Sequence, residues 1–165
     1  QIISHTLHME KIAIFVDVQN IYYTTRQHFH KYFNYTALWE QVTKNREVVA
    51  AFAYAIDKGD SKQRSFQNTL SKIGFQVKLK PYIQRKDGSA KGDWDVGITI
   101  DIMELAPKVD TVILLSGDGD FDLLLQKIRH AHQVKTEVYG VTALTAPSLI
   151  NSSDKFIPIT QTLLL

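Results

Sequence analysis

The stretch TVILLSGDGDFDLLLQKI, residues 111–128, contains a strand-to-helix change from which the rest of the architecture follows. It begins with five apolar and β-branched residues, which is typical of a short buried strand. It ends with FDLLLQKI, whose apolar side chains recur at helical spacing. Asp118 and Asp120 lie in the turn, and Asp122 follows it. Each of these carboxylates needs a hydrogen-bond donor, solvent or a cation, so the turn also predicts a functional site.

Strand-like and helix-like segments alternate on both sides of this stretch. Strands are predicted at residues 11–18, 47–56, 75–83, 110–116, 133–141 and 155–160. Helices are predicted at residues 20–33, 36–45, 57–73, 94–106, 120–132 and 148–154, and residues 84–93 form a polar loop. This order predicts a parallel sheet covered by helices on both faces. The fold class is therefore α/β, in a single domain.

The predicted domain spans residues 11–160. Residues 1–10 are interpreted as an N-terminal extension or a cloning remnant, and residues 161–165 as a C-terminal tail. The apolar ending TQTLLL is expected to be frayed or packed on a neighbour.

Composition excludes several classes of protein. A chain of 165 residues with 44% hydrophobic and 22% charged residues is typical of one globular domain. The absence of cysteine excludes disulfides and thiolate metal sites. No segment approaches the roughly 20 apolar residues that span a bilayer, so we expect a cytoplasmic protein with no membrane contact. A net charge of +2 does not by itself indicate nucleic-acid binding.

Polar oxygen ligands are concentrated where predicted strands give way to helices. Asp17 ends the first strand and Asn20 follows it, Asp118 and Asp120 follow the fourth strand, and Asp95 begins a helix. The carboxyl ends of parallel strands lie at one edge of a sheet, so these groups should converge there. Grouped carboxylates repel one another unless a cation or a shared proton compensates. Oxygen-only ligands favour a hard cation such as Mg²⁺ or Mn²⁺.

Each aspartate also has a purely structural interpretation. Asp118 or Asp120 could cap the following helix, and Asp93 is expected to cap its own. Asp122 is expected only to complement a helix N-terminus. Asp101 lies about 240° around the helix from Asp95, so we expect it to be structural.

Three segments together resemble a known family. They are IFVDVQNIYY at 14–23, KGDWDVGITIDIMELA at 91–106 and VILLSGDGDFDLLLQKI at 112–128, supported by VKTEVYGV at 134–141 and SLINSSDKFIPI at 148–159. This ordered set resembles the NYN domain, in the LabA-like branch of the PIN-like nuclease superfamily. The resemblance implies a three-layer, Rossmann-like α/β/α fold and a metal-dependent ribonuclease site. It nominates Asp17, Asn20, Asp95, Asp118 and Asp120 as catalytic, with the four aspartates as metal ligands.

One acidic residue that is common in the sites of PIN-like nucleases has no clear equivalent in this sequence. PIN-like nucleases often carry a glutamate on a helix in the site, and Glu40 and Glu47 are the loose candidates here.

Substrate contacts are predicted from cations and small residues near strand ends. The candidates are Arg26, Lys58, Lys62, Arg64, Lys91 and Ser116. The aromatic residues Tyr22, Tyr23, Phe29, Tyr32 and Phe33 could stack bases, but their helical spacing predicts that most are buried in the core.

The function predicted is hydrolysis of phosphodiester bonds, in single-stranded RNA, by a Mg²⁺- or Mn²⁺-dependent ribonuclease. The alternative is a non-catalytic RNA-binding or regulatory adaptor with the same fold. A zinc site is disfavoured because His28 and His30, like His130 and His132, are two residues apart and do not share a helix face. Homo-oligomer formation is left open.

Overall fold

The protein forms one six-stranded parallel sheet with helices on both faces. The structure is a computed structural model that describes residues 8–81, 83–84, 90–91 and 93–165. The strands of the sheet are β1 (Glu10–Asp17), β2 (Arg46–Asp57), β3 (Gln76–Pro81), β6 (Thr111–Leu115), β7 (Lys135–Gly140) and β8 (Lys155–Pro158), in the spatial order β3-β2-β1-β6-β7-β8. This architecture confirms the predicted fold class.

The chain reverses the direction of sheet growth between β1 and β6. It first builds β2 and β3 on one side of β1, and then crosses over to place β6, β7 and β8 on the other side. Residue pairs such as Val16 and Leu115 keep β1 and β6 level, so the two strands end side by side. Ligand sites of open parallel sheets form at such a switch point, beyond the carboxyl ends of the strands.

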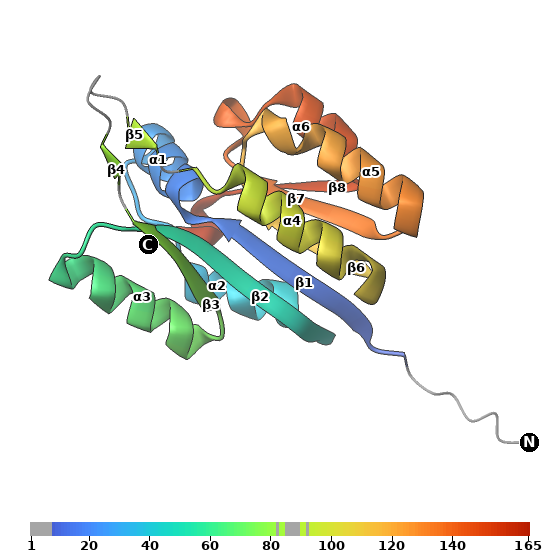
Figure 1. Ribbon diagram of the computed structural model, residues 1–165, viewed down its shortest axis with the longest axis horizontal. Coiled ribbons are helices and arrows are strands. Elements are labelled where there is room, and N and C mark those ends of the chain that lie inside the picture. Colours follow the sequence, from blue (N-terminus) through green and yellow to red (C-terminus); the bar gives the residue numbers. More distant parts are fainter. Residues whose placement is uncertain (1–7, 82, 85–89, 92) are drawn as a thin grey trace, which may run out of the picture.

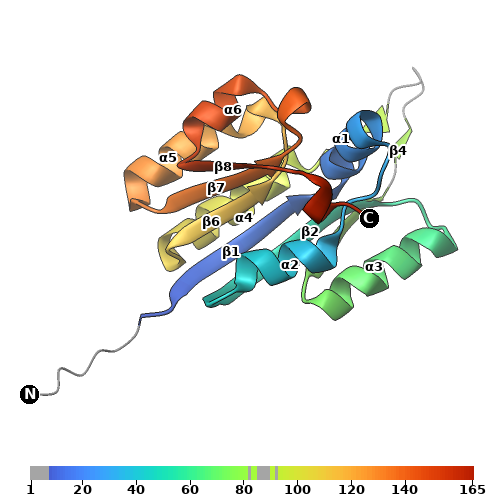
Figure 2. The same cartoon turned by 180° about the vertical axis from the view of Figure 1, so that it is seen from behind.

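Alternation of side chains along β1 supplies two hydrophobic cores. Ile12, Ile14 and Val16 pack with the layer formed by α1 (Val18–Phe29), α2 (Tyr35–Thr43) and α3 (Ser61–Ile73). Ala13 and Phe15 face the layer formed by α4 (Asp95–Leu105), α5 (Asp122–His132) and α6 (Pro147–Ser152). Figure 1 shows α4 crossing in front of the strands, and Figure 2 shows α2 from the opposite side.

Polar caps begin the helices of the first layer. Asn34 accepts a hydrogen bond from the backbone N–H of Ala37 at the start of α2, and Asp60 accepts one from Gln63 at the start of α3. Gly74, with φ of 141°, ends α3, because this backbone conformation is strained for residues with a Cβ. The end of α3 at Ile73 matches the prediction, whereas its start lies after the cap Asp60 and not at residue 57 as predicted.

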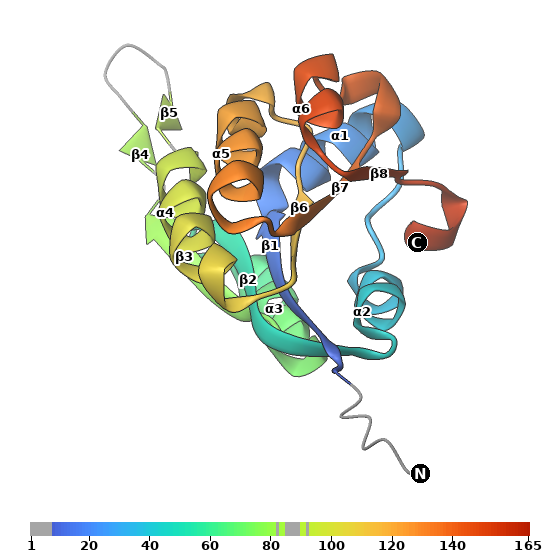
Figure 3. The ribbon, with the colours of Figure 1, turned by 90° about the vertical axis from the view of Figure 1, so that its right-hand side faces the viewer.

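The last residues of the chain pack on a neighbouring segment of this same chain, so the tail is not frayed. Leu163 and Leu164 are buried, in and after the 3₁₀ turn η4 (Gln161–Leu163). The N–H of Asn34 donates to the carbonyl of Leu163 over 2.7 Å, and the N–H of Leu165 donates to Tyr32 over 2.8 Å. Figure 3 shows this end of the chain close to α2. The side chains of Leu163 and Leu164 complete the hydrophobic core on the side of α1, α2 and α3.

The polar loop contains more structure than predicted. Two short strands, β4 (Ile83–Gln84) and β5 (Ala90–Lys91), pair in antiparallel fashion outside the main sheet. Residues 1–7 of the predicted extension at residues 1–10 lie outside the described residues. Glu10, its last residue, belongs to β1. Among the helices of the described residues, none has the length and apolar character needed to cross a membrane.

Candidate functional site

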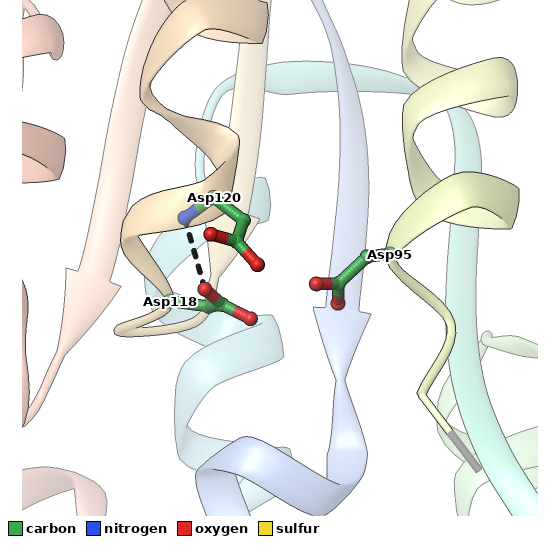
Figure 4. Close-up of side chains that lie close together, drawn as sticks. All are labelled: Asp95, Asp118 and Asp120. Atoms are coloured by element: carbon green, nitrogen blue, oxygen red, sulfur yellow. Dashed lines mark hydrogen bonds between the residues drawn. The ribbon is translucent and has the colours of Figure 1, made fainter. Parts of the chain in front are cut away.

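Three aspartates from two separate segments converge at the switch point of the sheet. Asp95 begins α4, whereas Asp118 and Asp120 follow β6. One carboxylate oxygen from each lies within 4.8 Å of the other two. Figure 4 shows the three side chains pointing into a common space next to the end of β1. We call these three residues the acidic cluster.

The loop after β6 holds its two aspartates through backbone hydrogen bonds. The N–H of Asp120 donates to Oδ1 of Asp118 over 2.9 Å, so Asp118 caps the 3₁₀ turn η2 (Gly119–Phe121). The N–H of Asp118 in turn donates to Oγ of Ser116 over 3.1 Å. Phe121 is buried and anchors the turn to the core. Asp118 therefore serves as a helix cap and as a member of the acidic cluster, so the two interpretations of this residue are compatible.

The two glycines of this loop are required by close packing. A Cβ on Gly117 would lie 2.7 Å from the carbonyl oxygen of Leu144, and a Cβ on Gly119 would lie 2.8 Å from the Cβ of Ala146. The carbonyl of Gly117 also accepts from the N–H of Ala146 over 3.0 Å. The turn is thus pressed against the segment that leads into α6, which fixes the direction of the aspartates.

Asp17 lies next to the acidic cluster, at the end of β1, but it is more deeply buried. Its side chain is held by Oγ of Ser116, which donates over 3.2 Å, and by the N–H of Asn20 over 3.4 Å. Burial raises the pKa of Asp17 to about 6, against the lowering effect of these hydrogen bonds, and the charges of Asp118 and Asp93 raise it further. Asp17 is not one of the three residues whose oxygens meet within 4.8 Å.

The electrostatics of Asp95 show that the acidic cluster is crowded with negative charge. The pKa of Asp95 is raised to about 7. Burial has the largest effect, and the charge of Asp118 and a hydrogen bond between the two side chains raise the pKa further. Asp93 and Asp17 add smaller effects in the same direction. A shared proton relieves this repulsion in the absence of a cation, and a bound cation would relieve it better.

Ser116 and Asn20, two of the predicted site residues, form hydrogen bonds within the protein. Ser116, predicted to be part of the substrate site, is completely buried and uses its hydroxyl to connect Asp17 with the N–H of Asp118, so its side chain does not face a substrate. Asn20 accepts from the N–H of Gly117 over 2.9 Å and ties the start of α1 to the loop after β6. Both residues position carboxylates.

The aspartates interpreted as structural are structural. Asp101 accepts from the hydroxyl of Tyr54 and from Nζ of Lys78, each over 2.7 Å, and does not belong to the acidic cluster. Asp93 accepts from the N–H of Asp95 over 3.1 Å just before α4, although the N-cap position of this helix is occupied by Trp94 and not by Asp93 as expected. Its charge nevertheless contributes to the raised pKa of Asp95, which the sequence pattern did not indicate.

The candidate glutamates lie away from the acidic cluster. Glu47 of β2 lies opposite Lys11 of β1 in the register of the two strands. This position is near the amino ends of the strands, whereas the acidic cluster lies at their carboxyl ends. Glu40 is exposed on α2. Within the described residues, the grouping that could hold a metal consists of aspartates alone.

The cations nominated for substrate contact occupy different positions. Lys58 and Lys62 line a cavity between α1 and α3, and Arg64 is exposed on α3. Arg26 stacks over the ring of Tyr32 at 4.5 Å and donates to the carbonyl of His30, so its guanidinium is engaged within the protein. Lys91 belongs to β5, and its side chain lies outside the described residues.

The aromatic residues of the first helical segment are more exposed than predicted. Tyr22, Tyr23 and Tyr32 expose 47%, 53% and 53% of their surface, whereas Phe33 is buried. The prediction that most of the five are core residues is therefore wrong. The buried stripe of α1 consists of Val18, Ile21 and Thr25 instead, which leaves the neighbouring tyrosines on the outside. A closer count of helical periodicity could have separated the two groups.

Comparisons with known proteins agree with this geometry. The sequence profile of the NYN domain matches residues 11–160. The low amplitude and bright protein LabA of Synechococcus elongatus is 28% identical over 160 residues, which cover 90% of this chain and 83% of that protein. A crystal structure of a protein of unknown function from Vibrio parahaemolyticus is 55% identical, with a TM-score of 0.93, and the match covers 98% of this chain and 99% of that one.

A more distant structural match concerns the fold alone. A carbohydrate kinase from Agrobacterium tumefaciens is 12% identical, with a TM-score of 0.51, over 90% of this chain and 60% of the kinase. This likeness reflects the shared layering of a parallel sheet between helices.

Proposed function

We propose that this chain, which belongs to the NYN domain family, is a divalent-metal-dependent ribonuclease that hydrolyses phosphodiester bonds in single-stranded RNA. The observation that carries the proposal is the acidic cluster, in which Asp95, Asp118 and Asp120 come within 4.8 Å of one another at the switch point of the sheet. Exposed acidic groups are common on proteins, but these three are held together although the pKa of Asp95 is raised to about 7. The arrangement is unfavourable for folding without a cation, which favours a functional role.

The donor set fits Mg²⁺ or Mn²⁺. All three side chains offer carboxylate oxygens, which suit hard cations that keep several of their waters. Asp95, Asp118 and Asp120 would hold the ion. When bound, such an ion supplies positive charge to the phosphodiester and lowers the pKa of a water molecule.

The neighbouring residues would hold this site in shape. Ser116 and the N–H of Asn20 donate to Asp17, and Asn20 also accepts from Gly117, so one connected set of hydrogen bonds joins the ends of β1 and β6. Asp17 remains close enough for its charge to raise the pKa of Asp95. It would accept a proton from, or orient, a water molecule at the edge of the acidic cluster.

The test is cleavage of end-labelled single-stranded RNA in the presence of Mn²⁺. We expect Asp118→Asn to lower the rate at least about 100-fold, because substitutions around metal sites that leave the ligands in place already cost 10- to 100-fold. Asp122→Asn is the matched control, since it removes the same charge four residues further along the chain, at the start of α5, but Asp122 is outside the acidic cluster. Equal rates in the wild type and Asp118→Asn would contradict the assignment.

A non-catalytic RNA-binding adaptor is the second candidate. It is favoured by the composition of the acidic cluster, which has no glutamate among the described residues. Tight RNA binding and intact Mn²⁺ binding without turnover, over a broad panel of single-stranded RNAs, would support the adaptor.

A further inference from the structure

A cavity of about 450 Å³ lies at the carboxyl end of β2, between α1 and α3. Ala55 and Ile56 of β2 and Phe66 of α3 contribute to its apolar lining. Its volume is within the usual range for small-molecule sites, which is roughly 300 to 1,000 Å³. We call it the tyrosine cavity, because Tyr22, Tyr23 and Tyr32 line it.

The three tyrosines form a connected set of rings. The centroids of Tyr22 and Tyr23 are 5.4 Å apart, and those of Tyr22 and Tyr32 are 6.3 Å apart. About half of the surface of each side chain is exposed, although such large rings are usually buried. Arg26 stacks over Tyr32 and fixes the far end of the set. These rings are therefore held in place and remain accessible to a flat partner.

Positive charge borders the same cavity. Lys58 and Lys62 belong to its lining, one at the end of β2 and one in the first turn of α3. The lining also includes the acid Asp60, but its carboxylate caps α3 by accepting from the N–H of Gln63 over 2.7 Å. An occupant that combines an aromatic ring with negative charge matches this surface.

Two lining residues of the tyrosine cavity lie at the start of α1, next to the end of β1. Val18 and Gln19 line the cavity and directly follow Asp17 in the chain. Tyr22 is five residues beyond Asp17 along α1, or roughly 7.5 Å at the rise of an α-helix. That distance corresponds to about two nucleotides of a stacked strand. A strand of a few nucleotides is therefore long enough to reach from the end of β1 to the cavity.

We propose that the tyrosine cavity is a nucleobase subsite, in which a base of single-stranded RNA stacks on the ring of Tyr22 and meets the ring of Tyr23 edge-on, while Lys58 and Lys62 contact the adjoining phosphates. The proposal rests on the proposed function in taking RNA as the occupant. Stacking on aromatic rings accepts every base, so the subsite selects unpaired strands without strong preference for sequence. A base in a duplex is paired and stacked and must leave its helix to enter.

Binding of a short fluorescent oligoadenylate tests the subsite. It is measured in EDTA with the Asp118→Asn protein as parent, so that cleavage does not interfere. We expect Tyr22→Ala in this parent to weaken binding roughly 5- to 150-fold, the range for loss of one base–aromatic stack. Tyr22→Phe keeps the ring and should restore the affinity, whereas Leu123→Ala, which shortens an exposed apolar side chain on α5, should leave it unchanged.

Charge and strandedness give two further readouts. Lys62→Ala should lower the slope of log affinity against log salt concentration by about 1, as expected for one lost phosphate contact. Lys127→Ala, an exposed lysine of α5, should not change that slope. The same oligonucleotide paired with its complement should bind more weakly than the single strand.

The outcomes separate this proposal from the proposed nuclease. If the wild type does not cleave RNA but Tyr22→Ala still weakens binding, the subsite stands and the nuclease assignment fails. If Tyr22→Ala and Tyr23→Ala both bind the oligoadenylate as tightly as the parent, the subsite is wrong whatever the cleavage assay shows. Both side chains are half exposed, so unaltered thermal unfolding of the variants is expected and is checked first.

Discussion

The aspartates of this chain form two groups that differ in what surrounds their carboxylates. Asp101 lies 2.7 Å from the ammonium of Lys78, and Asp154 lies 2.8 Å from the guanidinium of Arg129. Asp110 accepts from the N–H of Lys11 over 2.8 Å. The members of the acidic cluster lie close to one another instead, and within the described part of the chain none of them forms an ion pair with a basic side chain.

The pKa values follow this division. The pKa of Asp110 is lowered, first by the hydrogen bond from the N–H of Lys11 and then by His8. The pKa of Asp95 is raised to about 7 by burial and by the neighbouring carboxylates. The charge of the first group stabilises the fold, whereas negative charge in the second group destabilises it. We infer that the second arrangement persists because it binds a cation.

Replacing one aspartate from each group should change the free energy of unfolding in opposite directions. Asp101→Asn should destabilise the protein by about 1 to 3 kcal/mol, because it leaves Lys78 without its charge partner. Asp95→Asn in EDTA at pH 8 should stabilise it, because it removes charge repulsion within the acidic cluster. Asp95 also gains a favourable interaction with the N-terminus of α4, but its raised pKa shows that the unfavourable effects are larger.

Urea unfolding of both variants beside the wild type measures this difference. A loss of stability in Asp95→Asn similar to that in Asp101→Asn would mean that the two groups of aspartates do not differ as described.

The pH dependence of stability should distinguish the same two groups by a smaller effect. Because the folded protein holds the Asp95 proton more tightly than the unfolded chain does, the free energy of unfolding should fall as pH rises from about 4 to about 7 in EDTA. Solvent screening of this partly exposed site should limit the change to less than about 1 kcal/mol. Asp17, whose pKa is about 6, acts in the same direction over the lower part of this range.

Asp110 should show the reverse dependence. Its lowered pKa contributes stability above the pKa of the unfolded chain, and this contribution is lost as pH falls below about 4. Unfolding curves of Asp95→Asn and Asp110→Asn across pH 3 to 8 compare the two. Asp95→Asn should flatten the slope between pH 4 and 7, and an unchanged slope there would count against the raised pKa.

Much of the fold could be predicted from local sequence. Strands such as β6 are short runs of apolar residues, and the following helix α5 is marked by the helical spacing of its buried residues. Because parallel strands align their carboxyl ends, the convergence of Asp118 with Asp95 could be expected from element order alone. The structure brings these two together with Asp120 as that reasoning predicts.

The remaining features depend on tertiary packing that no local pattern contains. Ser116 looks like a flexible loop residue, and only the position of β1 beside β6 makes its hydroxyl a partner for Asp17. Leu163 and Leu164 near the end of the chain are buried because an apolar surface near Phe33 is available to them. Tyr22 and Tyr23 are exposed because α1 leaves that side of the helix open toward the tyrosine cavity.

A calorimetric titration with Mn²⁺ tests the central claim, that the acidic cluster is a cation site, most directly. We expect one saturable binding event in the wild type and in Asp101→Asn, whose carboxylate is occupied by Lys78 and Tyr54. Asp95→Asn should bind Mn²⁺ at least about 10-fold more weakly, since loss of a ligand exceeds the smallest effects seen for groups around metal sites. No saturable binding in the wild type, or equal affinity in Asp95→Asn, would contradict the claim.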